Sequence, residues 1–252
     1  MQQKDLYDDI DQDAWNYRFV SPFSWVISGS SGAGKSFMLA QFIKNHKRLI
    51  VPEQKRLLVA YRHKQRLYDD FSNHIDTRFM NQPGVIPKPS ELQNADILII
   101  DDLMKSMDEA LDYFTIHSHH LKINVIFITQ NFYAPGMRTL SLNSNYLTIY
   151  KNPRDSSQIN FLSKQLEPKN SKLVIDAYAM STERPHGYLH INCRQKCHKF
   201  FKYRDNVDAY DNCSVFVSKE DKFIHITFQE FFEAIQSGLP IENAIQQLMD
   251  KQ

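Results

Sequence analysis

The sequence has few of the features that mark secreted or membrane-spanning proteins. Only 3 of its 252 residues are cysteines, an odd number that argues against a disulfide framework and favours a reducing compartment. No apolar run approaches the length of about 20 residues that a membrane-spanning helix needs. The first residues are acidic and polar, Asp5, Asp8 and Asp9 among them, and are unlike a secretion signal. We therefore expect no membrane span.

The chain also lacks an excess of charge of either sign. Its 30 lysines and arginines are balanced by 29 aspartates and glutamates, so the formal net charge is +1. A globally cationic surface is thereby excluded, and contact with nucleic acid needs a local basic strip. Basic residues cluster within 44–48, 62–66 and 194–204. Phosphate contacts from such clusters are independent of base sequence and sensitive to salt, although charge runs are usually solvated faces.

The most informative segment that is present is GSSGAGKS, a complete phosphate-binding loop or Walker A motif. Apolar residues before it and at helical spacing after it place the loop between a strand and a helix. Its glycines let successive backbone N–H groups face phosphates at the positive end of the helix. We expect Lys35 to reach the β- and γ-phosphates and the Ser36 hydroxyl to coordinate Mg²⁺. The residues expected to hold the nucleotide are Gly29, Ser30, Ser31, Gly32, Ala33, Gly34, Lys35 and Ser36.

The segment ILIIDDL supplies the second half of the expected site, a Walker B motif. Asp101 follows four aliphatic residues, so its carboxylate is predicted at the carboxyl edge of a buried strand, beside the loop. There it would hold Mg²⁺ directly or through water. Asp102 is the candidate general base that orients the attacking water. Two adjacent acids can also simply end a strand, and without the phosphate loop that interpretation would be preferred.

A third strand-like segment, NVIFITQN, ends at Thr129, Gln130 and Asn131. In the common arrangement of such ATPases this strand lies between the phosphate-loop strand and the magnesium strand. Gln130 would then face the γ-phosphate, where it senses that group or positions water. The alternative is a surface amide just beyond a strand.

Apolar strands alternate with helical patterns along the chain, which indicates a parallel sheet with helices on both faces. The predicted fold is therefore α/β, a P-loop NTPase of the RecA-like (ASCE) type. We expect an N-terminal arm at 1–20, an ATPase core at 21–205 and a C-terminal appendage of unassigned role at 206–252. The predicted strands are 23–28, 57–61, 96–101, 124–129, 146–150, 187–192, 198–203 and 223–228. The predicted helices are 36–46, 62–72, 106–120, 156–166, 171–180, 229–236 and 241–250, and 76–95 is predicted as a loop.

Four segments occur in a characteristic order: GSSGAGKS, ILIIDDL, VIFITQN and NSNYLTIYKNPRD. In this order the chain resembles the FtsK–HerA superfamily of DNA-pumping ATPases, and most of all its viral genome-packaging branch of the poxvirus, adintovirus and Polinton type. The stretch LLVAYRHKQRLYDDF, with Tyr61, Gln65 and Tyr68, is similar to a segment that those enzymes carry after the first helix. The resemblance covers roughly residues 20 to 204, and the Gln-bearing strand with KNPRD is its specific part.

The resemblance implies an ATP- and Mg²⁺-dependent ring of identical subunits, a pentamer or hexamer. Such a ring threads double-stranded DNA into a preformed capsid without sequence specificity and engages a capsid vertex protein. It works inside the infected host cell, in the nucleus or a viral factory, or with the virion. A neighbouring subunit inserts an arginine finger. Arg138 is the first candidate, followed by Arg154 and Arg204, and the alternative for each is an ordinary solvated or structural arginine.

One departure and two rival functions accompany this interpretation. Many members of the superfamily carry Glu where this chain has Asp102, and the shorter side chain would hold water differently. A P-loop ATPase of the helicase-loader type also combines a phosphate loop with an IDDL-like strand, but it usually ends the next strand in Ser or Thr and Asn. A ring scaffold that nucleotide merely locks is the other rival, and the intact Lys35, Ser36 and Asp101 argue against it.

Overall fold

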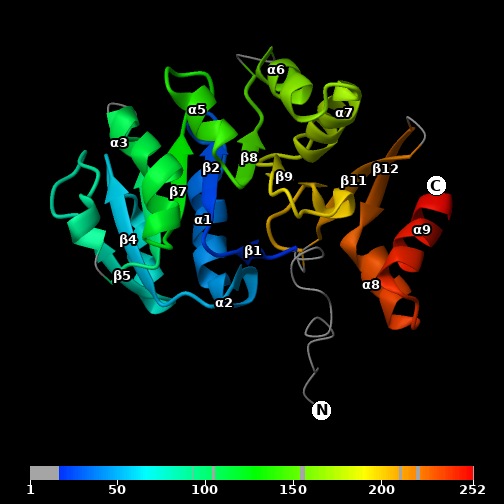
Figure 1. Ribbon diagram of the computed structural model, residues 1–252, viewed down its shortest axis with the longest axis horizontal. Helices are drawn as coiled ribbons and strands as arrows, with labels where there is room; N and C mark the ends of the chain where they lie inside the picture. The colour runs from blue at the N-terminus through cyan, green and yellow to red at the C-terminus, as the bar shows by residue number, and fades with distance from the viewer. Residues whose placement is uncertain are drawn as a thin grey trace.

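Most of the described chain is organised around one large sheet (Figure 1). The structure is a computed structural model of residues 1–252 and describes 17–92, 94–103, 106–153, 157–209, 212–219 and 222–251. Within these ranges a 10-stranded sheet has the order β12-β11-β10-β9-β8-β2-β7-β6-β4-β5. In that order the strands are Lys222–Thr227, Ser214–Lys219, Tyr203–Arg204, Tyr188–Asn192, Tyr146–Tyr150, Ser24–Ser28, Asn124–Thr129, Ile97–Asp101, Arg56–Tyr61 and Asp76–Phe79.

The strands from β8 to β5 are all parallel, whereas β9 to β12 are antiparallel to their neighbours. A separate two-stranded sheet pairs β1 (Phe19–Val20) with β3 (Ile50–Val51). The helices are α1 (Lys35–Lys44), α2 (His46–Leu49), α3 (Met107–Asp112), α4 (Ser118–His120), α5 (Met137–Leu142), α6 (Ser157–Leu166), α7 (Ser171–Ser181), α8 (Phe228–Gln236) and α9 (Ile241–Lys251). None of the helices in the described ranges has the length and hydropathy needed to cross a bilayer.

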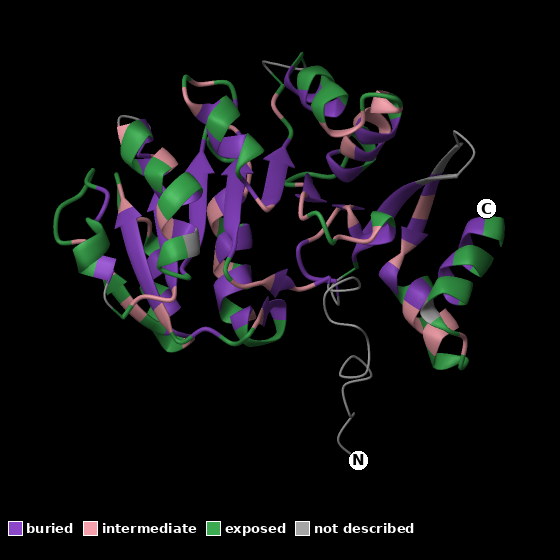
Figure 2. Ribbon diagram, viewed as in Figure 1, coloured by how far each residue is buried: buried purple, intermediate pink, exposed green. Residues whose placement is uncertain are grey.

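The central strands are buried on both faces, which is why they are almost continuously apolar (Figure 2). Side chains alternate along each strand, so Val26 faces one core cluster while Trp25 and Ile27 face the other. Helix α1 covers the Trp25 face, and α3, α5, α6 and α7 cover the Val26 face. The predicted α/β fold with helices on both faces of a parallel sheet is therefore confirmed.

The five predicted strands of the parallel core are present, and the differences lie elsewhere. Residues 66–73 form a 3₁₀ helix in place of the helix predicted over 62–72. The predicted loop 76–95 begins with the edge strand β5, whose sequence DTRF has no apolar alternation to reveal it. The strand predicted over 198–203 was wrong in most of its length. Phe200 and Phe201 are adjacent and both buried in one cluster, which a 3₁₀ turn allows and a strand does not.

The C-terminal segment continues the main sheet. Strand β11, which was not predicted, pairs with β10 through Val215 and Arg204, and β12 pairs with β11. Helices α8 and α9 pack on this hairpin in a third core cluster that also contains Tyr17, Phe200 and Phe201. The proposed boundary after residue 205 thus falls between two paired strands.

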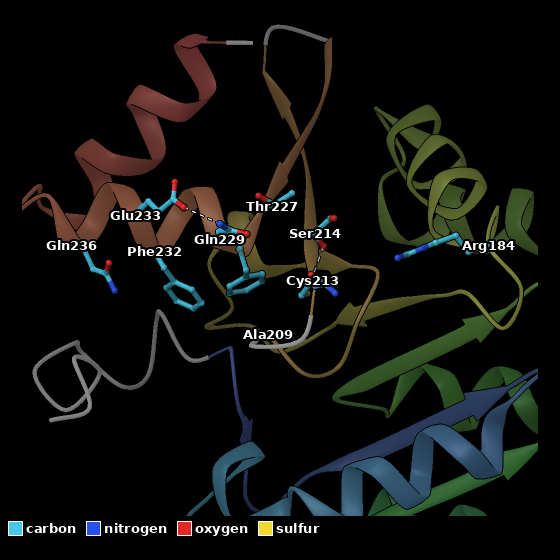
Figure 3. A pocket seen from close by; sticks show the side chains of 11 residues that line it. Arg184, Ala209, Cys213, Ser214, Thr227, Gln229, Phe232, Glu233 and Gln236 are labelled. Atoms are coloured by element: carbon cyan, nitrogen blue, oxygen red, sulfur yellow. Dashed lines mark hydrogen bonds between the residues drawn. The ribbon is translucent and has the colours of Figure 1, made fainter. Parts of the chain in front are cut away.

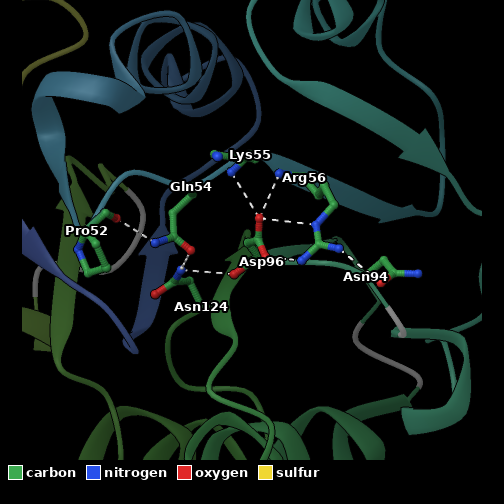
Figure 4. Close-up of polar contacts among 7 residues, drawn as sticks. All are labelled: Pro52, Gln54, Lys55, Arg56, Asn94, Asp96 and Asn124. Carbon is green, nitrogen blue, oxygen red and sulfur yellow. Dashed lines mark hydrogen bonds and ion pairs between the residues drawn. The ribbon is translucent and has the colours of Figure 1, made fainter.

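Polar side chains connect the amino ends of four neighbouring strands (Figure 4). Asp96 accepts hydrogen bonds from the backbone N–H groups of Lys55 and Arg56 and forms an ion pair with the Arg56 guanidinium at 2.8 Å. Asn124 accepts from the Phe23 N–H and donates to the Asp96 carbonyl and to Gln54. These bonds set the relative positions of β2, β7, β6 and β4, whose opposite ends carry the candidate site.

The ion pair of Asp96 predicts acid sensitivity. Burial opposes ionisation of Asp96, but the bonds from Arg56 and Lys55 outweigh it, and the pKa of Asp96 is lowered. Its contribution is complete above the unfolded-state pKa of about 3.9 and is lost as the pH falls below that value. Asp96→Asn should therefore lower the free energy of unfolding by about 1 to 2 kcal/mol at pH 7.

Urea unfolding at pH 7, 5 and 4 checks this prediction. The difference between wild type and Asp96→Asn should persist at pH 5 and begin to shrink at pH 4. Asp112→Asn changes an exposed aspartate of α3 and serves as the control, with little effect at any pH. A deficit for Asp96→Asn that stays constant across the range contradicts the assignment.

Candidate nucleotide-binding site

The predicted phosphate loop leaves β2 and turns directly into α1. Gly32 and Gly34 have φ angles of 78° and 105°, in the left-handed region that favours glycine. Gly29 needs to be glycine for a different reason, because a Cβ there would lie 2.5 Å from the Cβ of Tyr150. The loop therefore rests on β8 at its start and delivers its last residues into the first turn of α1.

Lys35 is the first residue of α1 and folds back over the loop. Its amine donates to the carbonyl oxygens of Gly29 at 2.6 Å and Ser30 at 2.9 Å, and the residue is 9% exposed. Burial lowers the pKa of Lys35, and the nearby carboxylates of Asp101 and Asp102 partly offset that effect. The amine is thus held at the mouth of the loop, between its carbonyls and the two acids.

Asp101 ends β6 in a nearly buried position. Its Oδ2 accepts hydrogen bonds from the Tyr68 hydroxyl at 2.5 Å and from the Gln65 amide at 3.0 Å. Burial raises the pKa of Asp101, whereas these two donors stabilise the ionised form and lower it. The Ser36 side chain lies close enough to the Tyr68 hydroxyl to influence its pKa. One tyrosine therefore links the two residues predicted to hold Mg²⁺.

Asp102 turns away from the strand, and Gln130 meets it there. Asp102 has a φ of 58°, an uncommon conformation for a residue other than glycine, and its N–H donates to the Ile128 carbonyl at 3.1 Å. The Gln130 amide donates to Asp102 Oδ2 at 3.1 Å. The contact exists because β7 lies between β2 and β6, as the sequence predicted.

These residues meet in one cavity of about 470 Å³ at the carboxyl edge of the sheet. Its lining includes Lys35, Ser36, Asp101, Asp102 and Gln130. Oxygen donors from a hydroxyl and a carboxylate suit Mg²⁺, which usually takes one or two protein ligands and completes its shell with phosphates and water. Within the described residues no cluster of three or more His, Cys, Asp or Glu side chains offers an all-protein metal cage.

The arginine candidates have different positions. Arg138 is exposed in the first turn of α5 and does not line this cavity, so its role as a finger for a neighbouring subunit stays a prediction. Arg154 lies outside the described residues. Arg204 is only 1% exposed and donates to the Tyr17 carbonyl at 2.8 Å. A side chain buried in its own subunit does not reach a neighbour, so Arg204 was a wrong candidate.

Each of the three basic clusters has one or two members that pair with an acid. Lys47 faces Glu53, Arg48 pairs with Asp208, Lys64 with Asp69 at 2.6 Å, and Lys202 with Glu167 at 2.6 Å. Each of the three clusters therefore contains at least one neutralised charge.

Three contributors to the site lay outside the predicted set of site residues. Gln65 and Tyr68 were noted only for their likeness to a family segment, and nothing in the sequence indicated that both bond Asp101. His186, in the loop between α7 and β9, has a φ of 62° and places its Nδ1 3.2 Å from the Ala33 carbonyl. An unusual backbone conformation beside a binding loop is a common mark of function.

A separate hollow of about 640 Å³ lies between α8, β11 and Arg184 (Figure 3). Its polar groups pair with one another or with neighbours: Gln229 donates to Glu233 at 3.0 Å, and Arg184 faces Asp205 at 3.0 Å. Burial raises the pKa of the Cys213 thiol, which makes it a poor nucleophile. This hollow has no phosphate-binding group comparable to the loop.

A comparison with protein-family models gives no match, and neither does one with curated proteins. Among solved structures, the chain is similar to the genome packaging NTPase B204 of Sulfolobus turreted icosahedral virus 2 in complex with ATP-gammaS, with 14% identity, a TM-score of 0.45, and coverage of 68% of this chain and 92% of that one. The chain is also similar to B204, the DNA-packaging ATPase from Sulfolobus turreted icosahedral virus, with 15% identity, a TM-score of 0.47, and coverage of 68% of this chain and 92% of that one. It is similar as well to a KaiC-like protein from Pyrococcus horikoshii OT3, with 13% identity, a TM-score of 0.40, and coverage of 82% of this chain and 90% of that one.

The contact between Gly29 and Tyr150 yields a prediction for the loop. Gly29→Ala introduces a methyl group into occupied space, so the loop or β8 has to move. We expect the variant to lose about 3 to 10 °C in Tm, because overpacking a well-packed site typically costs 1–3 kcal/mol. Ser30→Ala, at the next position, is the control and should leave Tm unchanged. An unaltered Tm for Gly29→Ala contradicts the packing described here.

Proposed function

We propose that this protein is a Mg²⁺-dependent ATPase that drives double-stranded DNA into a viral or viral-like capsid. The observation that carries the ATPase assignment is the meeting of Lys35, Ser36, Asp101, Asp102 and Gln130 in one cavity. These side chains come from the ends of the neighbouring strands β6 and β7 and from the first turn of α1. Together they supply groups that bind phosphate, hold a metal ion and orient water in phosphoryl transfer.

Each residue has a distinct task in this proposal. The loop N–H groups and Lys35 bind the β- and γ-phosphates, while Ser36 and Asp101 hold Mg²⁺, which neutralises developing charge on the phosphates when bound. Asp102 accepts the proton of the attacking water. Gln130, hydrogen-bonded to Asp102, holds that carboxylate in place and registers the γ-phosphate.

The DNA-packaging part of the proposal is supported by the sequence resemblance and by one surface of the chain. Arg138 and Leu142 are four residues apart on α5, so they share one helix face, and Leu142 is 62% exposed. Tyr133 and Phe161 form another exposed apolar pair on neighbouring elements, with ring centroids 6.1 Å apart. Exposed apolar groups on α5 and at Tyr133 and Phe161 suit a contact between subunits, in which we expect Arg138 to be directed at the neighbour's site.

Steady-state ATP hydrolysis with and without duplex DNA, at two salt concentrations, tests the function. A packaging motor should be stimulated by duplexes of any sequence, and salt should weaken the stimulation because the contacts are to phosphates. Lys35→Ala supplies the blank. Hydrolysis indifferent to DNA contradicts the motor and favours a helicase-loader type or a scaffold.

Separate variants should distinguish binding from chemistry. We expect Lys35→Ala to lose ATP binding, because it removes the cation that holds the phosphates. Asp102→Asn should bind ATP like wild type but hydrolyse it at least about 100-fold more slowly, because the amide is no longer a base. Binding is measured by calorimetry and turnover by phosphate release. Normal hydrolysis by Asp102→Asn rules out its assignment as the base.

We expect Tyr68 to affect hydrolysis by positioning the residues that hold Mg²⁺. Tyr68→Phe removes the hydroxyl that orients Asp101 and contacts Ser36, so the Mg²⁺ concentration for half-maximal hydrolysis should rise about 10-fold. ATP binding without Mg²⁺ should not change. Tyr113→Phe is the matched control, because Tyr113 is also buried and donates to a carbonyl, that of Pro87, outside the site. Equal effects of the two variants would point to general loss of packing.

A further inference from the structure

A second hollow begins where the phosphate cavity ends. It measures about 240 Å³ and shares Gly34 and Phe37 with that cavity. Phe37 directly follows Ser36, so it lies at the junction between the two spaces. A nucleotide whose phosphates occupy the loop has to extend its ribose and base to one side of this junction. The first cavity ends in the acids and Gln130, and the second hollow leads away from them along α1.

The walls of the second hollow suit a flat heterocycle. Phe37 is 62% exposed, which is unusual for so large an apolar side chain and leaves its ring face available for stacking. His186 also lines this hollow, and its contact with the Ala33 carbonyl holds it against the loop. A Cβ on Gly34 would meet the His186 side chain at 3.1 Å, so the two residues are in close contact.

Polar groups for reading a base edge line the same hollow. Phe37 and Gln41 on α1 and the C-cap residue Asn45 recur at spacing four and line the same hollow. The carboxamides of Gln41 and Asn45 have no hydrogen-bond partner among the residues that the structure describes. A carboxamide offers one donor and one acceptor side by side, which matches the N6 and N7 edge of adenine. The ion pair between Arg48 and Asp208 borders the same hollow.

A competing hollow borders the first residues of the loop on the other side of His186. It is lined by residues 30–33 and 182–187 and contains the charged side chains Lys151, Glu183 and Arg184. A neutral aromatic base gains little from such surroundings, whereas stacking on Phe37 removes exposed apolar surface from water.

We propose that the hollow bounded by Phe37, Gln41 and His186 binds the adenine base of the nucleotide, with Phe37 as the stacking surface and Gln41 as the edge-reading group. The proposal rests on the proposed function, because the phosphate loop has to place the phosphates first. In this proposal the hollow determines which nucleotide binds, whereas hydrolysis takes place in the other cavity.

Calorimetric titration with two ligands, ATP and inorganic tripolyphosphate, tests the proposal. Phe37→Ala should weaken ATP binding about 10-fold, in line with the loss of base stacking, and leave tripolyphosphate binding unchanged. Phe37→Trp should restore ATP binding. Leu121→Ala is the control, because Leu121 is another exposed apolar side chain, directly after α4, and lines neither space. Gln41→Ala should reduce the preference for ATP over GTP.

The outcomes separate this proposal from the function on which it rests. Unchanged ATP affinity in Phe37→Ala, with Lys35→Ala still defective for both ligands, overturns the base site alone. Equal loss of ATP and tripolyphosphate binding in Phe37→Ala also overturns it, because the residue would then support the loop. A wild-type protein that binds neither ligand contradicts the proposed function and the base site together.

Discussion

A carboxylate buried at the end of an apolar strand is costly unless polar groups surround it, and Asp101 is such a carboxylate. The polar groups around Asp101 make up much of the candidate site. The Tyr68 hydroxyl and Gln65 amide donate to it, and the Lys35 amine lies close enough to influence its charge. Tyr68 is itself fully buried beside Phe71, in the same core cluster as α1. Tyr68 is therefore held by the core and positioned beside Asp101 before any ligand arrives.

Strand order provides the second constraint. The phosphate loop, the two acids and Gln130 are far apart in the chain, but they follow β2, β6 and β7, which are neighbours in one parallel sheet. Parallel strands end at the same edge, so the site needs little further folding to assemble. The hydrogen bonds of Asp96 and Asn124 hold the opposite ends of these strands. The pairing of the strands at their amino ends thereby sets the relative positions of the site residues at their carboxyl ends.

The parts of the site that the sequence predicted are those carried by continuous motifs. Lys35 and Ser36 end the Walker A motif, and Asp101 and Gln130 lie at or directly beyond the ends of strands whose apolar runs are unambiguous. The bond from Tyr68 to Asp101 spans 33 residues, and that from His186 to Ala33 spans 153, so neither leaves a local pattern. The same holds for the fold: the buried core strands were predictable, whereas β5 and β11 depend on pairing with neighbours at the outer parts of the sheet.

A structure of the protein with Mg²⁺ and a non-hydrolysable ATP analogue would show whether these residues bind nucleotide as proposed. We expect the Lys35 amine to leave the carbonyls of Gly29 and Ser30 and to bind the β- and γ-phosphates. The metal should then lie between Ser36 and Asp101, with Asp102 and Gln130 facing the γ-phosphate. Phosphates bound elsewhere, or a Lys35 amine still on the loop carbonyls beside bound nucleotide, would contradict it.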